Sequence, residues 1–202
     1  MKLNLLTCLL TLSIYSGYVL SEGDSAKGEA KAIICSACHG NDGISINQEW
    51  PNLASQHAKY IIKELTDFKN GKTRQEPTMT AMVANLSDTD IDDLAVFYAS
   101  KGLKISEKVK EKTARGEEIY RRGDLQKHIT ACIACHGPDG KGNGPAGFPL
   151  LSGQNPKYTI KQLNLFKDKS RTNDINSIMQ DISQHMSIED MQNVADYISI
   201  LH

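Results

Sequence analysis

The sequence predicts an all-α protein built from two copies of one helical unit. A series of short motifs occurs twice, in the same order, at an offset of 97 to 100 residues. Both copies space their apolar residues with the three-to-four-residue period of helices, and no segment shows the alternation of a half-buried strand. A shared helical pattern alone would not repeat the motifs in one order. A tandem duplication that covers nearly the whole chain after residue 21 is therefore the simplest explanation.

The most informative repeated motif is Cys35-Ser-Ala-Cys38-His39, which recurs as Cys132-Ile-Ala-Cys135-His136. C-x-x-C-H is the attachment signature of a c-type haem: the thiols add to the vinyl groups and the histidine binds the iron. A thioredoxin-like pair or a zinc site would leave the histidines unexplained, and the two pairs are too far apart for a zinc ribbon. We therefore expect two covalently bound haem c groups (iron), held by Cys35, Cys38, Cys132 and Cys135, with His39 and His136 as iron ligands.

The first two helices of each unit follow from local signals. The first leads into the haem motif, around Ala26–Ile34 in one copy and Ala114–Arg121 in the other. The second is expected over Gln56–Asn70, where Gly71 ends it. Its counterpart begins at Asn155-Pro156, which places an N-cap residue before a proline at the first helical position.

The last helix of each unit opens with a capping-box pattern, Ser87-x-x-Asp90 and Ser187-x-x-Asp190. Apolar residues follow at i, i+3, i+4 and i+7 spacing, so that one face of each helix is expected in the core. We expect Gly102 to cap the first of these helices. The charged segment after it marks the seam, which gives the domains 22–103 and 112–202 with a linker at 104–111.

Methionines are the expected sixth ligands of the two irons. A haem with one histidine has a methionine, a second histidine or an open position on its other side. Met79 precedes Ser87 by the same eight residues as Met179 precedes Ser187. This equivalence favours Met79 and Met179, each approaching from an irregular segment before the last helix. Met82 is the alternative in the first unit, whereas Met186 and Met191 are expected in the core.

Other residues near the motifs have two possible roles. Pro51 follows His39 by twelve residues and Pro149 follows His136 by thirteen. Either proline can offer a rigid carbonyl to the second ring nitrogen of the histidine, or can be a plain turn residue. Several side chains can bind haem propionates or lie at the edge of the core as ordinary polar residues: Gln56, Tyr60, Arg74, Gln154, Tyr158 and Arg171.

Residues 1–21 have the features of a secretory signal peptide. Lys2 precedes a mostly apolar run, and Val19-Leu20-Ser21 offers a cleavage site. Cys8 would be removed with it, which leaves four cysteines, all in the haem motifs. An uncleaved anchor is the alternative. The formal net charge of the chain is −1, without a basic stripe, which argues against nucleic acid as a partner.

The chain resembles the cytochrome c4 family of exported bacterial dihaem cytochromes. The resemblance rests on the paired haem motifs, the two P-x-L-x-x-Q segments, Arg171-Thr-Asn-Asp174 and Met79-Thr-Ala-Met82. It implies two class I cytochrome c domains, each wrapped around one haem, with the propionates near the interface. It further implies His39 and Met79 on one iron and His136 and Met179 on the other. Thr73-Arg-Gln-Glu76 departs from the family pattern, which puts the propionate contacts of the first unit in doubt.

The resemblance implies a periplasmic electron carrier, free or loosely associated with the membrane, between a quinol-oxidising complex and a terminal oxidase. Methionine on both irons would exclude substrates, and no other catalytic constellation is present in the sequence, so we expect no enzymatic activity. Two alternatives stay open. One is an electron-accepting subunit of a flavocytochrome-type, sulfide-oxidising dehydrogenase. The other is a dihaem enzyme, such as a peroxidase, with one open haem site.

Overall fold

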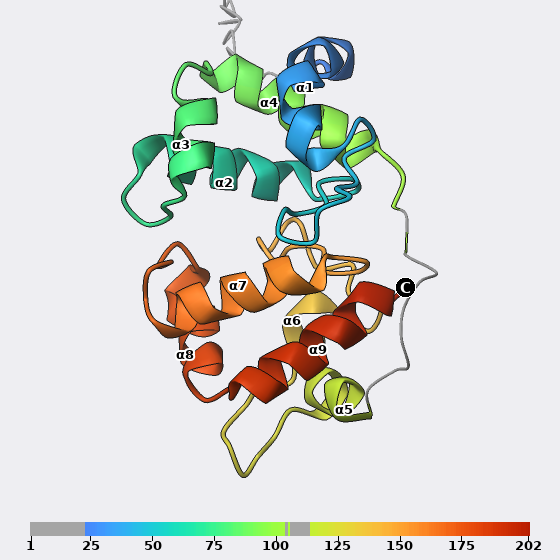
Figure 1. Cartoon of the computed structure of the whole chain (residues 1–202), viewed down its shortest axis with the longest axis vertical. Coiled ribbons are helices and arrows are strands. Elements are labelled where there is room, and N and C mark those ends of the chain that lie inside the picture. Colours follow the sequence, from blue (N-terminus) through green and yellow to red (C-terminus); the bar gives the residue numbers. More distant parts are fainter. Residues whose placement is uncertain (1–22, 104, 106–113) are drawn as a thin grey trace, which may run out of the picture.

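The computed structural model describes residues 23–103, 105 and 114–202 (Figure 1). The predicted signal peptide, residues 1–21, and the predicted linker, apart from Ile105, lie outside the described residues. Within the described part every regular element is a helix, and extended pairing is limited to two isolated bridges, Asp124–Ile129 and Asn143–Phe148. The predicted all-α fold is confirmed.

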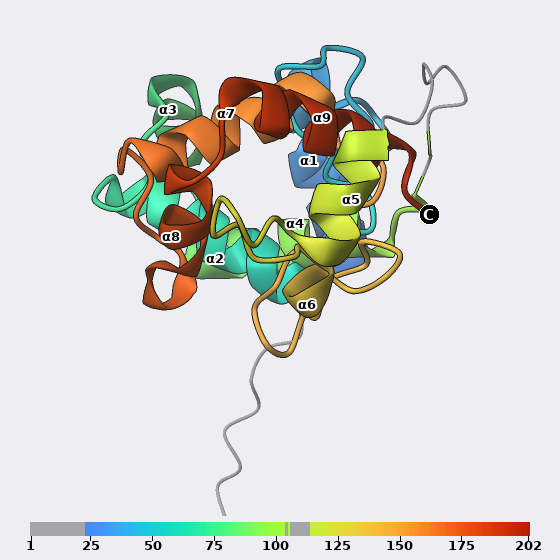
Figure 2. The same cartoon turned by 90° about the horizontal axis from the view of Figure 1, so that it is seen from below.

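Two helical domains are stacked along the long axis of the molecule (Figure 1). The first contains α1 (Ser25–His39), α2 (Ala58–Asn70), α3 (Pro77–Val83) and α4 (Asp88–Ser100). The second contains α5 (Ala114–Arg122), α6 (Ile133–His136), α7 (Pro156–Lys167), η1 (Ile175–Ser177), α8 (Ile178–Gln184) and α9 (Ile188–Ile200). The helices α2 and α7 lie on the two sides of the junction. Viewed from below, α5, α7, α8 and α9 surround the middle of the second domain (Figure 2).

The caps of the last helices agree with the sequence. Ser87 Oγ accepts a hydrogen bond from the Asp90 N–H, while the Asp90 carboxylate accepts from the Ser87 N–H, and the same box recurs at Ser187 and Asp190. Each such cap stabilises its helix by about 1 kcal/mol. The expected cap at Gly102 was wrong: α4 ends at Ser100, and Lys101 follows it in extended conformation.

Each domain has its core where the first helix crosses the last. In the first domain α1 packs on α4 so closely that a Cβ on Gly28 would lie 2.1 Å from the Asp93 carbonyl oxygen. The second domain repeats the crossing between α5 and α9. The apolar faces predicted for the last helices are buried, with Leu94 and Val194 at 2% and 1% exposure. Burial of such side chains stabilises each domain by about 1.5–3 kcal/mol per residue.

The two domains differ in the path that leads to the haem motif. In the first domain the motif is the last part of the continuous helix α1. In the second, α5 stops at Gly123, which has a φ of 71°, and a loop closed by the Asp124–Ile129 bridge precedes the one-turn helix α6. A side chain at Gly123 would meet the Ile129 carbonyl oxygen at 2.3 Å, so glycine is required at this turn.

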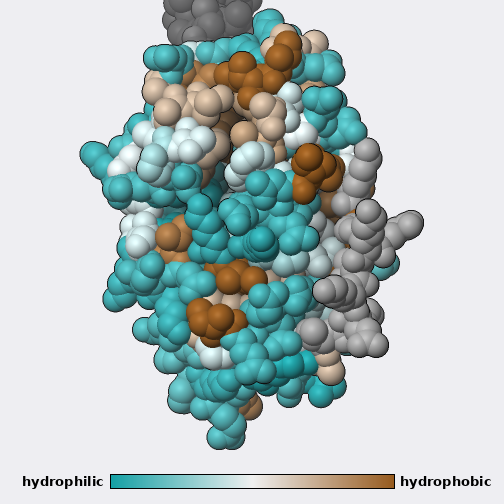
Figure 3. Space-filling model, viewed as in Figure 1, coloured by the Kyte–Doolittle hydropathy of each residue, from teal (hydrophilic) through white to brown (hydrophobic). Residues whose placement is uncertain are grey.

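Polar residues dominate the face of the molecule in Figure 3, and its apolar residues form small separate patches. Large exposed apolar side chains include Ile33, Ile34 and Ile46 in the first domain. Among the helices of the described residues, none has the length and apolar character needed to cross a membrane.

Candidate functional site

One cavity of about 820 Å³ extends through both domains and carries both haem motifs on its wall. Cys35, Cys38 and His39 line it from α1, and Cys132, Cys135 and His136 line it from the segment around α6. The four cysteines are half-buried. The volume is within the range of cofactor sites. The structure therefore brings together all six motif residues that the sequence singled out.

Both motif histidines are buried and held by a proline carbonyl. His39 Nδ1 lies 3.0 Å from the Pro51 carbonyl oxygen, and His136 Nδ1 lies 2.9 Å from that of Pro149. A carbonyl can only accept, so Nδ1 carries the proton and Nε2 keeps a free lone pair, as an iron ligand requires. Burial lowers the pKa of both histidines, which keeps the rings neutral although the carbonyl contact opposes the shift. The proline contacts suggested by the sequence are confirmed.

Glycines turn the chain from each histidine towards its proline loop. His39 is the last residue of α1, and the N–H of Gly40, at φ 79°, donates to the Ser36 carbonyl. His136 is the last residue of α6, and the N–H of Gly137, at φ 75°, donates to the Ile133 carbonyl. Positive φ is unfavourable for a residue with a side chain, so both repeats use glycine where the helix has to end next to the histidine.

The predicted ligand methionines both line the cavity, in matching places. Met79 is the third residue of α3 and Met179 is the second residue of α8. The expectation of an irregular segment was wrong for both, since each methionine lies in a short helix. Met82 also lines the cavity but is 40% exposed. Met186 and Met191 are buried in the core of the second domain, as predicted.

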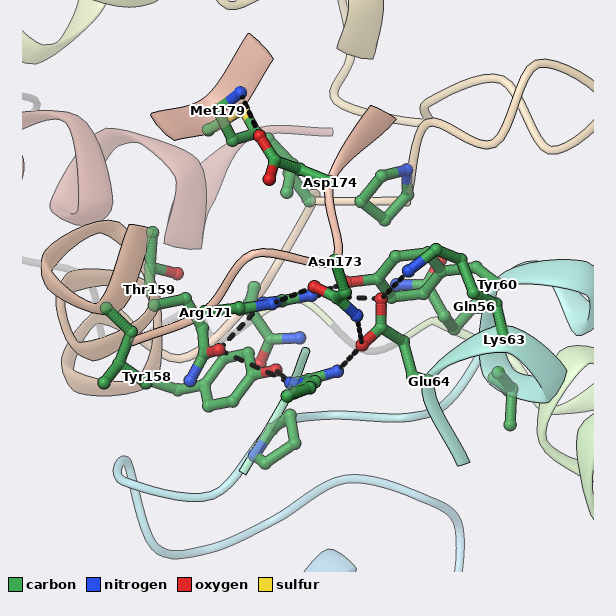
Figure 4. Close-up of a pocket in the computed structure, with 18 of the residues that line it drawn as sticks. Gln56, Tyr60, Lys63, Glu64, Tyr158, Thr159, Arg171, Asn173, Asp174 and Met179 are labelled. Carbon is green, nitrogen blue, oxygen red and sulfur yellow. Dashed lines mark hydrogen bonds and ion pairs between the residues drawn. The ribbon is translucent and has the colours of Figure 1, made fainter. Parts of the chain in front are cut away.

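The segment before Met179 is held by a carboxylate that the first domain does not use in this way. Asp174 accepts a hydrogen bond from the backbone N–H of Met179 at 2.8 Å (Figure 4). It accepts a second one from the backbone N–H of Gln180 at 3.1 Å. In the segment between Asp174 and Met179, Asn176 and Ser177 have left-handed φ values of 51° and 58°. Such residues cost about 1–3 kcal/mol and persist where their surroundings fix them. The counterpart of Asp174 is Glu76, which instead pairs with Lys161 across the interface at 2.6 Å.

Two glutamines join the domains by the same reciprocal contact. Gln56 Nε2 donates to the Leu150 carbonyl at 3.0 Å while Gln56 Oε1 accepts from the Leu150 N–H at 2.9 Å. Gln154 makes the mirrored pair with the backbone of Asn52, at 3.0 and 2.8 Å. From the sequence, these glutamines were either propionate ligands or polar residues at the edge of the core; in the structure they bind the backbone of the opposite domain.

Asn155 also contributes to the junction rather than to its own helix. It occupies the predicted N-cap position of α7, but its side chain makes no cap hydrogen bond. Its Nδ2 donates instead to the Trp50 carbonyl at 2.7 Å. The position was predicted correctly and the role of the side chain was not.

Two arginine–tyrosine hydrogen bonds also connect the domains, one in each direction. Arg74 Nη2 donates to the Tyr158 hydroxyl at 2.8 Å, and Arg171 Nη2 donates to the Tyr60 hydroxyl at 2.9 Å. Both arginines are buried, at 6% and 4% exposure. Burial raises the pKa of Tyr60 to about 12; the Arg171 charge opposes this shift and the Glu64 charge adds to it. The Tyr60 hydroxyl therefore stays neutral and can both donate and accept hydrogen bonds.

Glu64, which the sequence reasoning missed, lies next to Arg171 and Asn173 (Figure 4) and also contacts Arg74. Its carboxylate accepts from Arg74, from Arg171 Nη2 at 3.0 Å and from Asn173 Nδ2 at 2.8 Å. Burial opposes its ionisation, but the two guanidinium groups outweigh this effect and lower the pKa of Glu64 to about 2. A signal was available: its counterpart in the second copy is the uncharged Gln162.

The geometry fits two haem groups. The cavity offers two thiols, a neutral histidine and a methionine in each domain, and polar side chains, among them Arg74 and Arg171, line it where the two domains meet. Polar donors at one side of an otherwise apolar cavity match the amphipathic shape of a haem.

Comparisons with known proteins agree with this assignment. The cytochrome c family model matches the chain twice, over residues 25–100 and 113–201. Cytochrome c4 of Pseudomonas aeruginosa is 41% identical over 199 residues, 98% of each chain. A thiosulfate dehydrogenase electron acceptor of Stutzerimonas stutzeri is 36% identical over 172 residues, covering 83% of this chain and 79% of that protein.

A solved structure is similar as well. Reduced cytochrome c4 from Pseudomonas stutzeri superposes with a TM-score of 0.84 at 38% identity, covering 89% of this chain and all of that chain. With the two motifs, this similarity shows that Cys35, Cys38, Cys132 and Cys135 attach two covalent haem c groups. The chain therefore belongs to the cytochrome c4 family of dihaem electron-transfer proteins, which are electron carriers and not enzymes.

Proposed function

We propose that the protein carries single electrons in the periplasm, from a quinol-oxidising complex towards a terminal oxidase, through two haems that are both closed to substrates. The observation that carries the proposal is the matched set of one buried histidine and one half-buried methionine in each domain, on the wall of one cavity. Haem iron supplies one-electron chemistry between its ferric and ferrous states, and histidine–methionine ligation raises its reduction potential.

His39 with Met79 and His136 with Met179 are the residues that would hold the two irons. Pro51 and Pro149 fix the histidine rings and keep Nδ1 protonated. Met79 is supported over Met82 because α3 and α8 place Met79 and Met179 alike, near the start of a seven-residue helix. With both positions supplied by the chain, a change of oxidation state requires little rearrangement.

The continuity of the cavity supports electron exchange between the haems within one molecule. The cross-domain hydrogen bonds of Gln56 and Gln154 keep the two domains in one orientation, and a fixed orientation keeps the distance between the haems constant. We retain 22–103 and 112–202 as the domain boundaries, with the linker between them.

The location and the partners are proposed from the sequence and from the relatives. Residues 1–21 have the pattern of a signal peptide, which supports export to the periplasm. The partners would be redox proteins, and loose contact with the membrane would bring the carrier to a membrane-bound donor and acceptor.

A titration of the purified, reduced protein with carbon monoxide tests the closed haems. We expect two haems per chain and no carbon monoxide binding, because both sixth positions are occupied. Binding at one haem would overturn the carrier proposal in favour of an enzyme such as a peroxidase. Reduction by a quinol-oxidising complex and oxidation by a terminal oxidase, both reconstituted in vesicles, test the direction of transfer.

A second candidate is the acceptor subunit of a sulfur-oxidising dehydrogenase. It is favoured by the 36% identity to a protein named thiosulfate dehydrogenase electron acceptor. Rapid reduction by such a dehydrogenase with thiosulfate, together with slow reduction by the quinol-oxidising complex, would support it. A flavin-containing partner that copurifies with the chain would instead support the flavocytochrome-type subunit.

A further inference from the structure

The interface between the domains contains a buried charge cluster that is not symmetric. The arginines Arg74 and Arg171 come one from each domain and occupy crossed positions, each on a tyrosine of the other domain. Between them the first domain contributes Glu64, whereas the second contributes Gln162 at the equivalent place in α7. The Gln162 Oε1 atom accepts from Arg171 at 2.8 Å and lies 3.4 Å from Arg74. Each arginine thus contacts the same charged side chain, Glu64, together with the neutral Gln162 and a tyrosine of the other domain.

The charges of this cluster do not cancel. Two buried guanidinium groups face one buried carboxylate, which leaves one positive charge at the centre of the interface. At its edge, Lys63 Nζ lies 3.3 Å from the Glu64 carboxylate and 2.8 Å from that of Asp67, so Lys63 and Asp67 together add no net charge to the cluster. The cluster lies on the wall of the cavity that also carries both haem motifs. A charge in this position is screened far less than a charge at the surface.

We propose that Glu64 is a positioning residue for electron transfer. Its carboxylate neutralises one of the two arginine charges at the interface and thereby lowers the reduction potentials of the haems. It also joins the domains, because it pairs with Arg74 of its own domain and with Arg171 of the other. The inference rests on the proposed function, since it needs haems in both domains.

The sign of the effect follows from electrostatics. Ferric haem carries one positive charge more than ferrous haem, so a nearby carboxylate favours the ferric form and an arginine favours the ferrous form. Removal of the Glu64 charge takes away the carboxylate that both guanidinium groups share among the described residues. The reduced state then becomes more favourable, and the potentials rise.

The repeat supplies a matched set of variants. Glu64→Gln makes the first domain like the second, and Gln162→Glu makes the second like the first. The double variant restores the charge on the opposite side, in reach of the same two arginines. Glu76→Gln is the control, because Glu76 also forms an ion pair across the interface, with Lys161, but its side chain is 33% exposed whereas that of Glu64 is 7% exposed.

Redox titrations followed by haem absorbance provide the readout. For Glu64→Gln we expect the reduced-to-oxidised ratio at fixed ambient potential to rise about threefold to tenfold, where tenfold corresponds to 59 mV for one electron. Gln162→Glu should lower it. The double variant should return to within about twofold of the starting protein, and Glu76→Gln should change it by less than about twofold.

Unchanged potentials in Glu64→Gln and in Gln162→Glu would overturn the inference, as would a double variant that stays shifted with Glu64→Gln. If Glu64→Gln does not fold, Gln162→Glu alone decides, since it adds a charge and removes no ion pair. Haem content and carbon monoxide binding are measured on the same samples. Carbon monoxide binding by the starting protein would contradict the proposed function, while the potential shifts would still decide the role of Glu64.

Discussion

The two domains contain the same parts but hold them differently. In the first domain a continuous helix delivers the haem motif, and the methionine segment begins with a plain helix at Pro77. In the second domain a loop interrupts the approach to the motif, and Asp174 fixes the methionine segment through two backbone hydrogen bonds. The proline carbonyl that holds the histidine ring is alike in both domains. The contact with the histidine ring is therefore shared, while the approach to the motif and the anchoring of the methionine segment differ.

This difference indicates that the orientation of the histidine ring is fixed in both domains, whereas the anchoring of the methionine segment can vary. A histidine ring has to be oriented and kept neutral, and a rigid carbonyl does both. In the proposed ligation a methionine only has to reach the iron, and a methionine segment can do so whether or not a carboxylate anchors it. If Met79 and Met179 are the ligands, their segments are where the two haems would differ in ligand stability.

The largest effects are expected from removal of the methionines. Met79→Ala should open only the first haem to carbon monoxide and lower its potential by on the order of 100 mV or more, and Met179→Ala should do the same to the second. Redox and carbon monoxide titrations of each variant measure this. Met82→Ala is the control and should leave both haems closed. If it opens the first haem instead, Met82 is the ligand.

Acid should act on the interface through Glu64. Its pKa is lowered in the folded protein to about 2, so its ionised form contributes stability that is complete above pH 4.5 and is lost as the pH falls from 4.5 to about 2. The shift corresponds to roughly 3 kcal/mol. The midpoint temperature of thermal unfolding should therefore change less across this pH range in Glu64→Gln than in the unmodified protein. An equal pH dependence in both proteins would show that other carboxylates dominate.

The glutamine contacts should be equivalent in the two directions. Gln56→Ala and Gln154→Ala each remove a donor and an acceptor that bind the backbone of the opposite domain. We expect each to lower the free energy of unfolding by about 2 kcal/mol, because buried backbone groups lose their partners. Chemical denaturation measures both. A large difference between the two losses of unfolding free energy would show that the two glutamine contacts differ in energy although their hydrogen bonds are alike.

The smallest effect is expected from Asp174→Asn, which weakens the anchoring of the Met179 segment. An amide retains one acceptor oxygen but loses the charge, so a destabilisation of about 1 kcal/mol is expected. Carbon monoxide binding to the reduced protein in mild denaturant should then appear first at the second haem. Glu76→Gln should not promote binding at the first haem, since Glu76 does not hold the Met79 segment.

The features predicted correctly from the sequence depend on residues close in the chain. The capping boxes at Ser87 and Ser187 and the helix end at Gly71 are set by local hydrogen bonds and local φ values. The Pro51 contact lies within one loop of His39. These relations are encoded within about a dozen residues, so spacing located the caps and the helix end, and it gave the contact with Pro51 as one of two possible roles for that proline.

The features that were missed depend on contacts between the domains. Gln56 and Leu150 are 94 residues apart in sequence, and Glu64 is 107 residues from Arg171. Repeats in a sequence indicate that two domains exist but not which surfaces meet. Asn155 shows the same limit: its position was predictable, but its side chain follows the opposite domain.

The proton NMR spectrum of the reduced protein tests the central claim most directly, since the ring current of a haem shifts the methyl group of a bound methionine far upfield. The account predicts two such methyl signals, one lost in Met79→Ala and the other in Met179→Ala, with both retained in Met82→Ala. A single upfield methyl signal in the unmodified protein would show that one haem lacks a methionine ligand and would contradict the account of two closed, matched haems.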